Sequence, residues 1–206
     1  MVIESQTSHS HPLKSPAPAV LTLNSVDAVQ TDALAIAQQR LHQRQLGLCK
    51  DKRPLRQPVA IVGPRDATAE QLACARRLGE LLGQSRVPVL CGGKGGVMQA
   101  ASQGVQQSGG IVIGLLPEDD DALANDHLTV ALPTGMGISR NALIARGCIL
   151  MVAVGGGLGT MSEMALALQW DKPVLSIYDA PAVPGYQRFE NETDLAVAML
   201  KQLLEN

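Results

Sequence analysis

A glycine-rich turn at residues 155–160 carries the clearest chemical signal in this chain. It follows an apolar run at residues 152–154. Glycine lets backbone N–H groups approach an anion because no Cβ stands in the way. A helix N-terminus adds partial positive charge and unpaired N–H donors. The pattern predicts a phosphate site between a buried strand and a helix over residues 160–170. Its expected members are Gly155, Gly156, Gly157, Gly159 and Thr160.

Glu163 stands in the first turn of that expected helix, where a carboxylate is unusual for a phosphate site. Residues 160–163 fit the capping-box pattern, in which the carboxylate accepts a hydrogen bond from the backbone N–H of the first residue. Under that interpretation Glu163 only starts the helix. Under the alternative, it is a functional carboxylate beside the ligand. The spacing leaves both interpretations open.

Three more turns follow expected strands, and each could line the same pocket. They are GPRD at residues 63–66, GGKGG at 92–96 and PTGMGISRN at 133–141. Four glycines in the second turn are more than a tight connection needs, which indicates close backbone approach to a ligand. Arg65 could reach a phosphate or could be a solvated loop residue. From these turns we expect ligand contacts by Gly63, Arg65, Gly92, Gly93, Gly95, Gly96, Thr134 and Gly135.

Arg140 lies near the start of an expected helix, where a cation opposes the helix dipole. A counter-anion would offset this, which favours ligand binding over a surface Arg whose stem covers apolar neighbours. The dinucleotide fingerprint G-x-G-x-x-G is absent, and Lys94 is not followed by Ser or Thr. We therefore expect neither NAD binding of the usual kind nor a P-loop nucleoside triphosphatase.

Strand and helix patterns alternate from residue 59 to the C-terminus. We expect strands over residues 59–62, 87–91, 111–116, 128–132, 148–154 and 173–177, and helices over 68–83, 97–107, 139–146, 160–170 and 192–204. This alternation predicts an α/β fold with a doubly wound, Rossmann-like parallel sheet. Ligands of such sheets bind at the carboxyl ends of the strands, where all the glycine-rich turns fall.

The N-terminal quarter has a different character. Residues 1–23 are rich in Ser, His and Pro without periodicity, which predicts a disordered tail. Residues 24–57 hold an expected helix and a basic linker. Apolar residues recur along that helix at helical spacing, Ile36, Ala37 and Leu41 among them. We expect this helical extension to lie on the main domain or on a partner subunit. Residues 58–206 form the expected Rossmann-like nucleotide- or phosphate-binding domain.

Composition disfavours several classes of function. The net charge is −2 and aromatic residues make up 2% of the chain, so a basic stripe and stacking rings for nucleic acid are not expected. No apolar run reaches the length of a membrane span. The four cysteines lie far apart and form no CxxC pair, so no metal site is expected. A cytoplasmic location follows as the default expectation.

Three motifs in order resemble a known family. GGKGGVM, PTGMGISRN and GGGLGTMSE are similar to those of the Rossmann-like family once labelled "possible lysine decarboxylase". That family contains the Lonely Guy-type cytokinin riboside 5'-monophosphate phosphoribohydrolases and the molybdenum cofactor carrier proteins. The resemblance covers residues 59–177, and the last helix more loosely. It implies a homodimer or homotetramer.

The resemblance implies different chemistry in its two branches. In the hydrolases, the glycine turn would hold a 5'-phosphate, and Arg140 and Glu163 would be the catalytic pair that cleaves an N-glycosidic bond to a base and ribose 5-phosphate. Gly155 stands where the hydrolases have Pro, and Asn141 stands where they have Lys. These departures are closer to the carrier branch, which implies that a phosphorylated ligand such as the molybdenum cofactor is bound as cargo without turnover.

Overall fold

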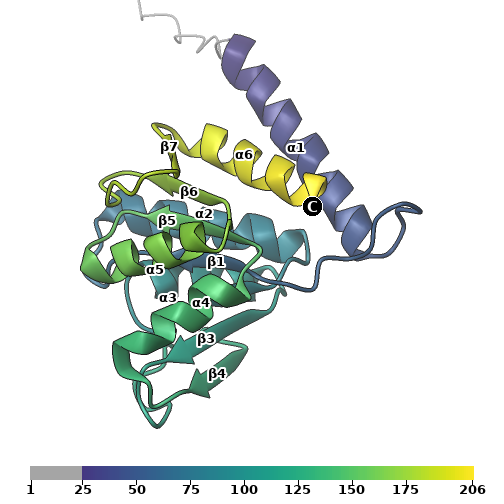
Figure 1. Cartoon of the computed structure of the whole chain (residues 1–206). Coiled ribbons are helices and arrows are strands. Elements are labelled where there is room, and N and C mark those ends of the chain that lie inside the picture. The colour runs from purple at the N-terminus through teal and green to yellow at the C-terminus, as the bar shows by residue number, and fades with distance from the viewer. Residues whose placement is uncertain (1–24) are drawn as a thin grey trace, which may run out of the picture.

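A seven-stranded parallel sheet forms the centre of the protein in a computed structural model, which describes residues 25–206, with side chains from residue 30 (Figure 1). The expected tail over residues 1–23 lies outside this range. The strands are β1 (Val59–Val62), β2 (Val89–Cys91), β3 (Val112–Leu116), β4 (Val130–Pro133), β5 (Leu150–Val154), β6 (Val174–Ile177) and β7 (Gln187–Phe189). The helices are α1 (Ser25–Gln45), α2 (Ala69–Gln84), α3 (Val97–Gln107), the 3-10 helix η1 (Gly137–Arg140), α4 (Asn141–Gly147), α5 (Leu158–Gln169) and α6 (Glu192–Glu205).

The strand order is β4-β3-β2-β1-β5-β6-β7, and all neighbouring strands are parallel. From β1 the chain first builds outward through β2, β3 and β4, and then returns to place β5 on the other side of β1. The order therefore reverses between β1 and β5, which pair from Val59 with Leu150 to Val62 with Ala153. This is a topological switch point, so the expected doubly wound, Rossmann-like fold is confirmed.

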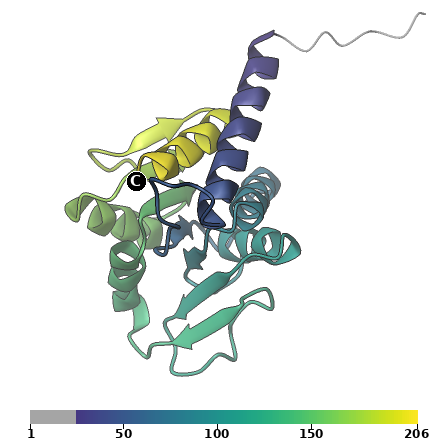
Figure 2. The same ribbon diagram turned by 90° about the vertical axis from the view of Figure 1, so that its right-hand side faces the viewer.

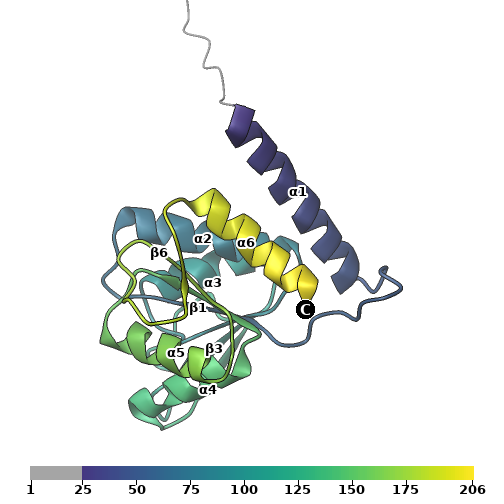
Figure 3. The same cartoon turned by 45° about the horizontal axis from the view of Figure 1, so that its top comes forward.

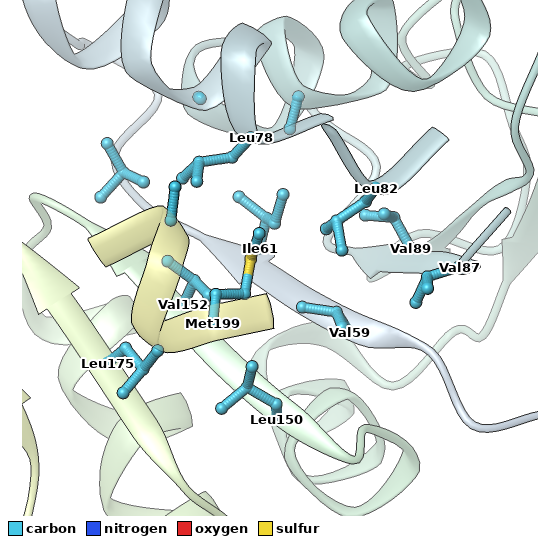
Figure 4. Packing of buried hydrophobic residues seen from close by; sticks show 14 of the residues in the cluster. Val59, Ile61, Leu78, Leu82, Val87, Val89, Leu150, Val152, Leu175 and Met199 are labelled. Carbon is cyan, nitrogen blue, oxygen red and sulfur yellow. The ribbon is translucent and has the colours of Figure 1, made fainter. Parts of the chain in front are cut away.

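Helices cover both faces of the sheet because alternate strand residues point to opposite sides. On one face, Val59, Ile61 and Val152 pack against α2, α3 and α6, as Figure 4 shows for Leu78, Leu82 and Met199. On the other face, the intervening residues pack against α4 and α5. With so few aromatic residues, aliphatic side chains and Met build both layers of the core.

A local signal explains where helix α2 begins. Thr68 accepts from the Gln71 backbone N–H, and the Gln71 side chain accepts from the Thr68 N–H, so the capping box expected at the start of α2 is confirmed.

Strand β7 was not expected, since residues 178–191 read as a loop rich in Pro and Gly. It is a short edge strand that pairs only with β6, which explains its weak apolar signal.

The helical extension packs on the C-terminal helix of the main domain. Figures 1 and 2 show α1 crossing α6, and Figure 3 shows its N-terminal half extending beyond the domain. The buried face of α1 includes Ala37, Leu41 and Arg44, whereas Ile36 is 52% exposed. Of the apolar residues expected along this helix, Ala37 and Leu41 therefore pack on the main domain, whereas Ile36 lies outside that contact. No helix in the described part of the chain is long and apolar enough to cross a membrane.

The basic linker fastens the extension to the end of α6. Arg44 donates to the carbonyl oxygens of Arg53 at 2.7 Å and Leu203 at 2.7 Å. Lys52 donates to those of Leu204 at 2.6 Å and Glu205 at 2.8 Å. The carbonyl groups of Leu203, Leu204 and Glu205 lie in the last turn of α6, where they have no intrahelical partner and attract cations. The positive charges of Arg44 at the end of α1 and of Lys52 in the linker thus cap α6.

Candidate functional site

A cavity of about 420 Å³ opens at the carboxyl ends of β1 and β5, at the switch point of the sheet. The turn after β1 and the turn after β5 form two of its walls, and η1 and the start of α4 form a third. Seven of the expected site residues line it: Gly63, Arg65, Arg140, Gly157, Gly159, Thr160 and Glu163. Five further lining residues were not expected from the sequence: Pro64, Met98, Pro117, Ile138 and Asn141.

The turn after β5 leads into α5 without a side-chain cap. The helix begins at Leu158 with Gly157 as its N-cap residue, and no side chain caps the first backbone N–H groups of the helix. The expected start at Thr160 was wrong, and so was the interpretation of Glu163 as a capping-box residue. A Cβ built on Gly157 or Gly159 would meet no heavy atom within 4 Å. The space at this helix N-terminus is therefore open to an anion.

The other two glycines of this turn have structural roles. Gly156 has φ of 147°, and a Cβ there would come within 2.5 Å of the Thr160 side chain. Gly155 has φ of 63°, is buried, and faces Gln71 and Asp179 rather than the cavity. These two glycines shape the turn, whereas Gly157 and Gly159 border the open space.

Arg140 and Glu163 form a buried ion pair in the wall of the cavity. Arg140 Nη1 donates to Glu163 Oε1 at 3.2 Å, and each side chain is 9% exposed. Burial raises the pKa of Glu163 from its usual 4.5 to about 7, although the positive charge and hydrogen bond of Arg140 lower it in part. Arg140 Nε is buried without a hydrogen-bond partner among the described residues. The carboxyl group can therefore hold or release a proton near neutral pH.

Asn141 joins this pair to the glycine turn, a role that its sequence position did not reveal. Its Oδ1 accepts from Arg140 Nη1, while its Nδ2 donates to Ser162 Oγ at 2.8 Å and to the Gly159 carbonyl oxygen at 3.4 Å. Ser162 Oγ in turn donates to Gly159 at 2.7 Å. The amide therefore links the start of α4 to the first turn of α5. In the sequence, Asn141 stood out only as the residue after Arg140 that departs from the hydrolase motif.

The glycine turn after β2, at residues 92–96, packs against the guanidinium of Arg140. A Cβ on Gly92 would lie 2.5 Å from Arg140 Nη2, which itself donates to the Gly92 carbonyl oxygen at 3.4 Å. Gly96 has φ of 69° and packs against the carbonyl groups of Pro64 and Arg65 in the turn after β1. Gly93 has φ of 73° and packs on the side chain of Leu116. A Cβ on Gly95 would make only an ordinary van der Waals contact, with the side chain of Gln99. None of these four glycines lines the cavity, so they position its walls.

The remaining candidates lie around the rim. Thr134 Oγ1 donates to the Leu116 carbonyl oxygen at 2.7 Å and accepts from the Met136 N–H, and the Gly135 N–H donates to Glu118. These two residues fix the turn after β4 and do not line the cavity. Lys94 is buried and pairs with Glu118 at 2.6 Å, so its charge is already matched. Arg65 is exposed on the turn after β1.

The fold and the cavity define a Rossmann-like α/β protein with a glycine-rich pocket at the switch point of its sheet. Residues 56–203 match the SLOG cluster4 family (LDcluster4), and the chain belongs to this family. Among the described residues, no group of three or more His, Cys, Asp or Glu side chains could hold a metal ion.

Three proteins are similar to this chain in sequence or in structure. An uncharacterized protein of Archaeoglobus fulgidus is 36% identical over 64% of this chain and 87% of its own length. The cytokinin riboside 5'-monophosphate phosphoribohydrolase LOG5 of Arabidopsis thaliana is 30% identical over 48% of this chain and 45% of its own length. The molybdenum cofactor binding protein of Rippkaea orientalis has 30% identity and a TM-score of 0.66, over 73% of this chain and 99% of that chain.

These matches confirm the resemblance to the group that contains both phosphoribohydrolases and molybdenum cofactor carriers. DNA processing protein A of Helicobacter pylori is also similar, with 19% identity and a TM-score of 0.56, which is a likeness of fold alone. The chain spans less than half the length of the Arabidopsis relative, whereas it spans almost all of the Rippkaea protein.

Proposed function

We propose that this protein binds a phosphorylated small molecule at the switch-point cavity and carries it without turnover, and that the ligand is the molybdenum cofactor. The observation that supports this most directly is the uncapped N-terminus of α5, where Gly157 and Gly159 leave open space in the wall of the cavity. A terminal phosphate fits there because the first backbone N–H groups of a helix are unpaired donors. The similarity to a molybdenum cofactor binding protein over nearly its whole length supports the identity of the cargo.

Each residue of the cavity has a separate task in this proposal. The first turn of α5 binds the phosphate, and Arg65 supplies positive charge from the opposite wall. The side chains of Met98, Pro117 and Ile138 offer apolar surface to the planar body of the ligand. A volume of about 420 Å³ lies within the range of small-molecule sites.

The test places a larger side chain in the proposed phosphate site at a position where the backbone can accept it. Gly157 has φ of −132°, which any residue adopts, and its Cβ would point into open space, so Gly157→Val should fold normally. The purified proteins are loaded with the molybdenum cofactor, washed and oxidised, and the retained pterin is measured by fluorescence. We expect retention by the natural chain and by Gln169→Val, an exposed change at the other end of α5, and a loss of at least ten-fold in Gly157→Val. Equal retention in all three proteins would contradict the proposal.

The second candidate is hydrolysis of a nucleoside 5'-monophosphate, and the buried Arg140–Glu163 pair favours it. Both side chains line the cavity beside the proposed phosphate site, and the raised pKa of Glu163 suits a carboxyl group that exchanges a proton near pH 7. A carboxylate can also stabilise the positive charge that develops on the ribose. The partial match to the plant phosphoribohydrolase supports this alternative over a shorter stretch.

Incubation with AMP and related monophosphates separates the two functions. Release of free base by the natural chain, absent in Glu163→Gln, would establish the hydrolase and exclude a pure carrier. No release from any monophosphate, combined with retention of the pterin cofactor, would exclude the hydrolase. Gln169→Val again serves as the control, since its change lies outside the cavity.

Self-association completes the proposal. Large apolar side chains are exposed on η1, α4 and α5, three elements that contribute residues to the cavity: Ile138 is 71% exposed, Leu158 84%, Leu143 42% and Met161 39%. Such a group of exposed apolar residues is typical of a protein interface. We therefore propose a homodimer or homotetramer that buries this surface. A cytoplasmic location and the absence of nucleic-acid binding remain part of the proposal.

A further inference from the structure

A second groove, of about 520 Å³, lies between α2 and α3 beside the switch-point cavity. Its lining includes the side chains of Arg65, Leu72, Arg76, Gln99, Gln103 and His127. None of the functions considered above uses it. Its size lies within the range of sites that enclose a nucleotide-sized ligand.

The groove adjoins the cavity at one side chain and one turn. Arg65 lines both spaces. The first turn of α3 runs between them, because Met98 lines the cavity and the next residue, Gln99, lines the groove. Gly96 lets this turn lie against the backbone of Arg65, since any Cβ at Gly96 would clash with the Pro64 and Arg65 carbonyl oxygens. At the backbone this contact separates the two spaces, so a ligand that occupies both must pass over the exposed Arg65 side chain.

The chemistry of the groove favours an anion with an apolar body. The guanidinium groups of Arg65 and Arg76 are exposed and make no hydrogen bond or ion pair with any other described residue. No carboxylate is among the residues that line the groove. Leu72 and neighbouring alanines supply an aliphatic floor, and the amides of Gln99 and Gln103 can bond to the edge of a base. Guanidinium groups bind phosphate with two parallel hydrogen bonds.

We propose that the groove binds a nucleoside 5'-phosphate unit joined to the phosphate in the cavity, so that the site accepts pyrophosphate-linked dinucleotides as well as monophosphates. This inference rests on the proposed function, because the first phosphate occupies the start of α5. Arg65 then lies at the pyrophosphate, and Arg76 binds the second phosphate or its ribose from the far side of the groove.

The test compares two soluble probes, AMP and diadenosine diphosphate, by isothermal titration calorimetry. We expect the dinucleotide to bind about ten-fold or more tightly than AMP, the scale of one hydrogen bond to a charged group. Arg76→Gln should remove this advantage and leave AMP affinity unchanged, because Arg76 lines the groove alone. Arg40→Gln, which removes the same charge from an exposed site on α1, should keep the advantage.

Two results would overturn the inference. One is equal affinity for AMP and the dinucleotide, with no effect of Arg76→Gln. The other is a failure of both probes to bind to a preparation that does take up the molybdenum cofactor. In either case the proposed function would stand, because retention of the pterin cofactor and its loss in Gly157→Val are measured separately.

Discussion

Arg140 and Glu163 lie 3.2 Å apart, Nη1 to Oε1, and both are almost completely buried although neither belongs to the hydrophobic core. A single contact of this kind does not fully offset the desolvation of two charges. The pair is held instead by its surroundings, since Asn141 and the Gly92 carbonyl oxygen also bind the guanidinium. A buried carboxyl group with a raised pKa and a charged partner at the wall of a cavity is typical of functional sites.

The raised pKa of Glu163 makes the stability of the fold depend on pH. In the folded protein this group keeps its proton up to about pH 7, whereas in the unfolded chain it loses the proton near 4.5. The folded state therefore binds more protons between these values, and the free energy of unfolding falls as the pH rises through this window. Across this window the free energy of unfolding is expected to fall by an amount on the order of 3 kcal/mol.

Urea unfolding of the natural chain and of Glu163→Gln, from pH 4.5 to pH 8, checks this expectation. Gln cannot titrate, so the stability of the variant should fall much less across the window. A natural chain whose stability rises with pH relative to the variant would show that Arg140 outweighs burial and holds Glu163 ionised.

Asn141 is expected to position the pair and to stabilise the fold. In Asn141→Ala, Arg140 loses a buried acceptor and α4 loses its link to Ser162 and Gly159. The free energy of unfolding should fall by about 1–3 kcal/mol, the range for an unpaired buried polar group. Ser162→Ala, which keeps the contact between Asn141 and Arg140, should have a smaller effect. Equal losses in the two variants would place the role of Asn141 in the link to α5 alone.

How far the sequence predicts this site depends on the kind of contact. The alternation of strands and helices predicted the sheet, and the turns after β1 and β5 predicted the cavity, because ligands of parallel sheets bind at carboxyl ends. The sequence did not separate glycines that border space, such as Gly157, from those that allow close packing, such as Gly92. That difference depends on which atoms approach from distant segments, here the guanidinium of Arg140. The ion pair with Glu163 joins residues 23 positions apart for the same reason.

The exposed apolar side chains of η1, α4 and α5 should control self-association. Leu143 on α4 is 42% exposed, and Leu143→Glu would bring a carboxylate into any interface formed there. We expect the molar mass in solution, measured by light scattering after size-exclusion chromatography, to fall toward the 21.7 kDa of one chain. Leu48→Glu, in the linker after α1 and 69% exposed, should leave the mass unchanged. A mass that changes only in the Leu48 variant would move the interface to the helical extension.

Arg44 should contribute strongly to the attachment of the helical extension. Its guanidinium is the buried charge that joins α1 to the linker and to the end of α6, through the carbonyl oxygens of Arg53 and Leu203. Arg44→Met keeps most of the packing volume but leaves both acceptors without this donor. The expected loss is roughly 2–4 kcal/mol in the free energy of unfolding, measured by urea denaturation. Arg40→Met, an exposed change on the same helix, should alter stability by less than about 0.5 kcal/mol. If the two variants are equally stable, the contact between α1 and α6 is held by Ala37 and Leu41 rather than by the guanidinium.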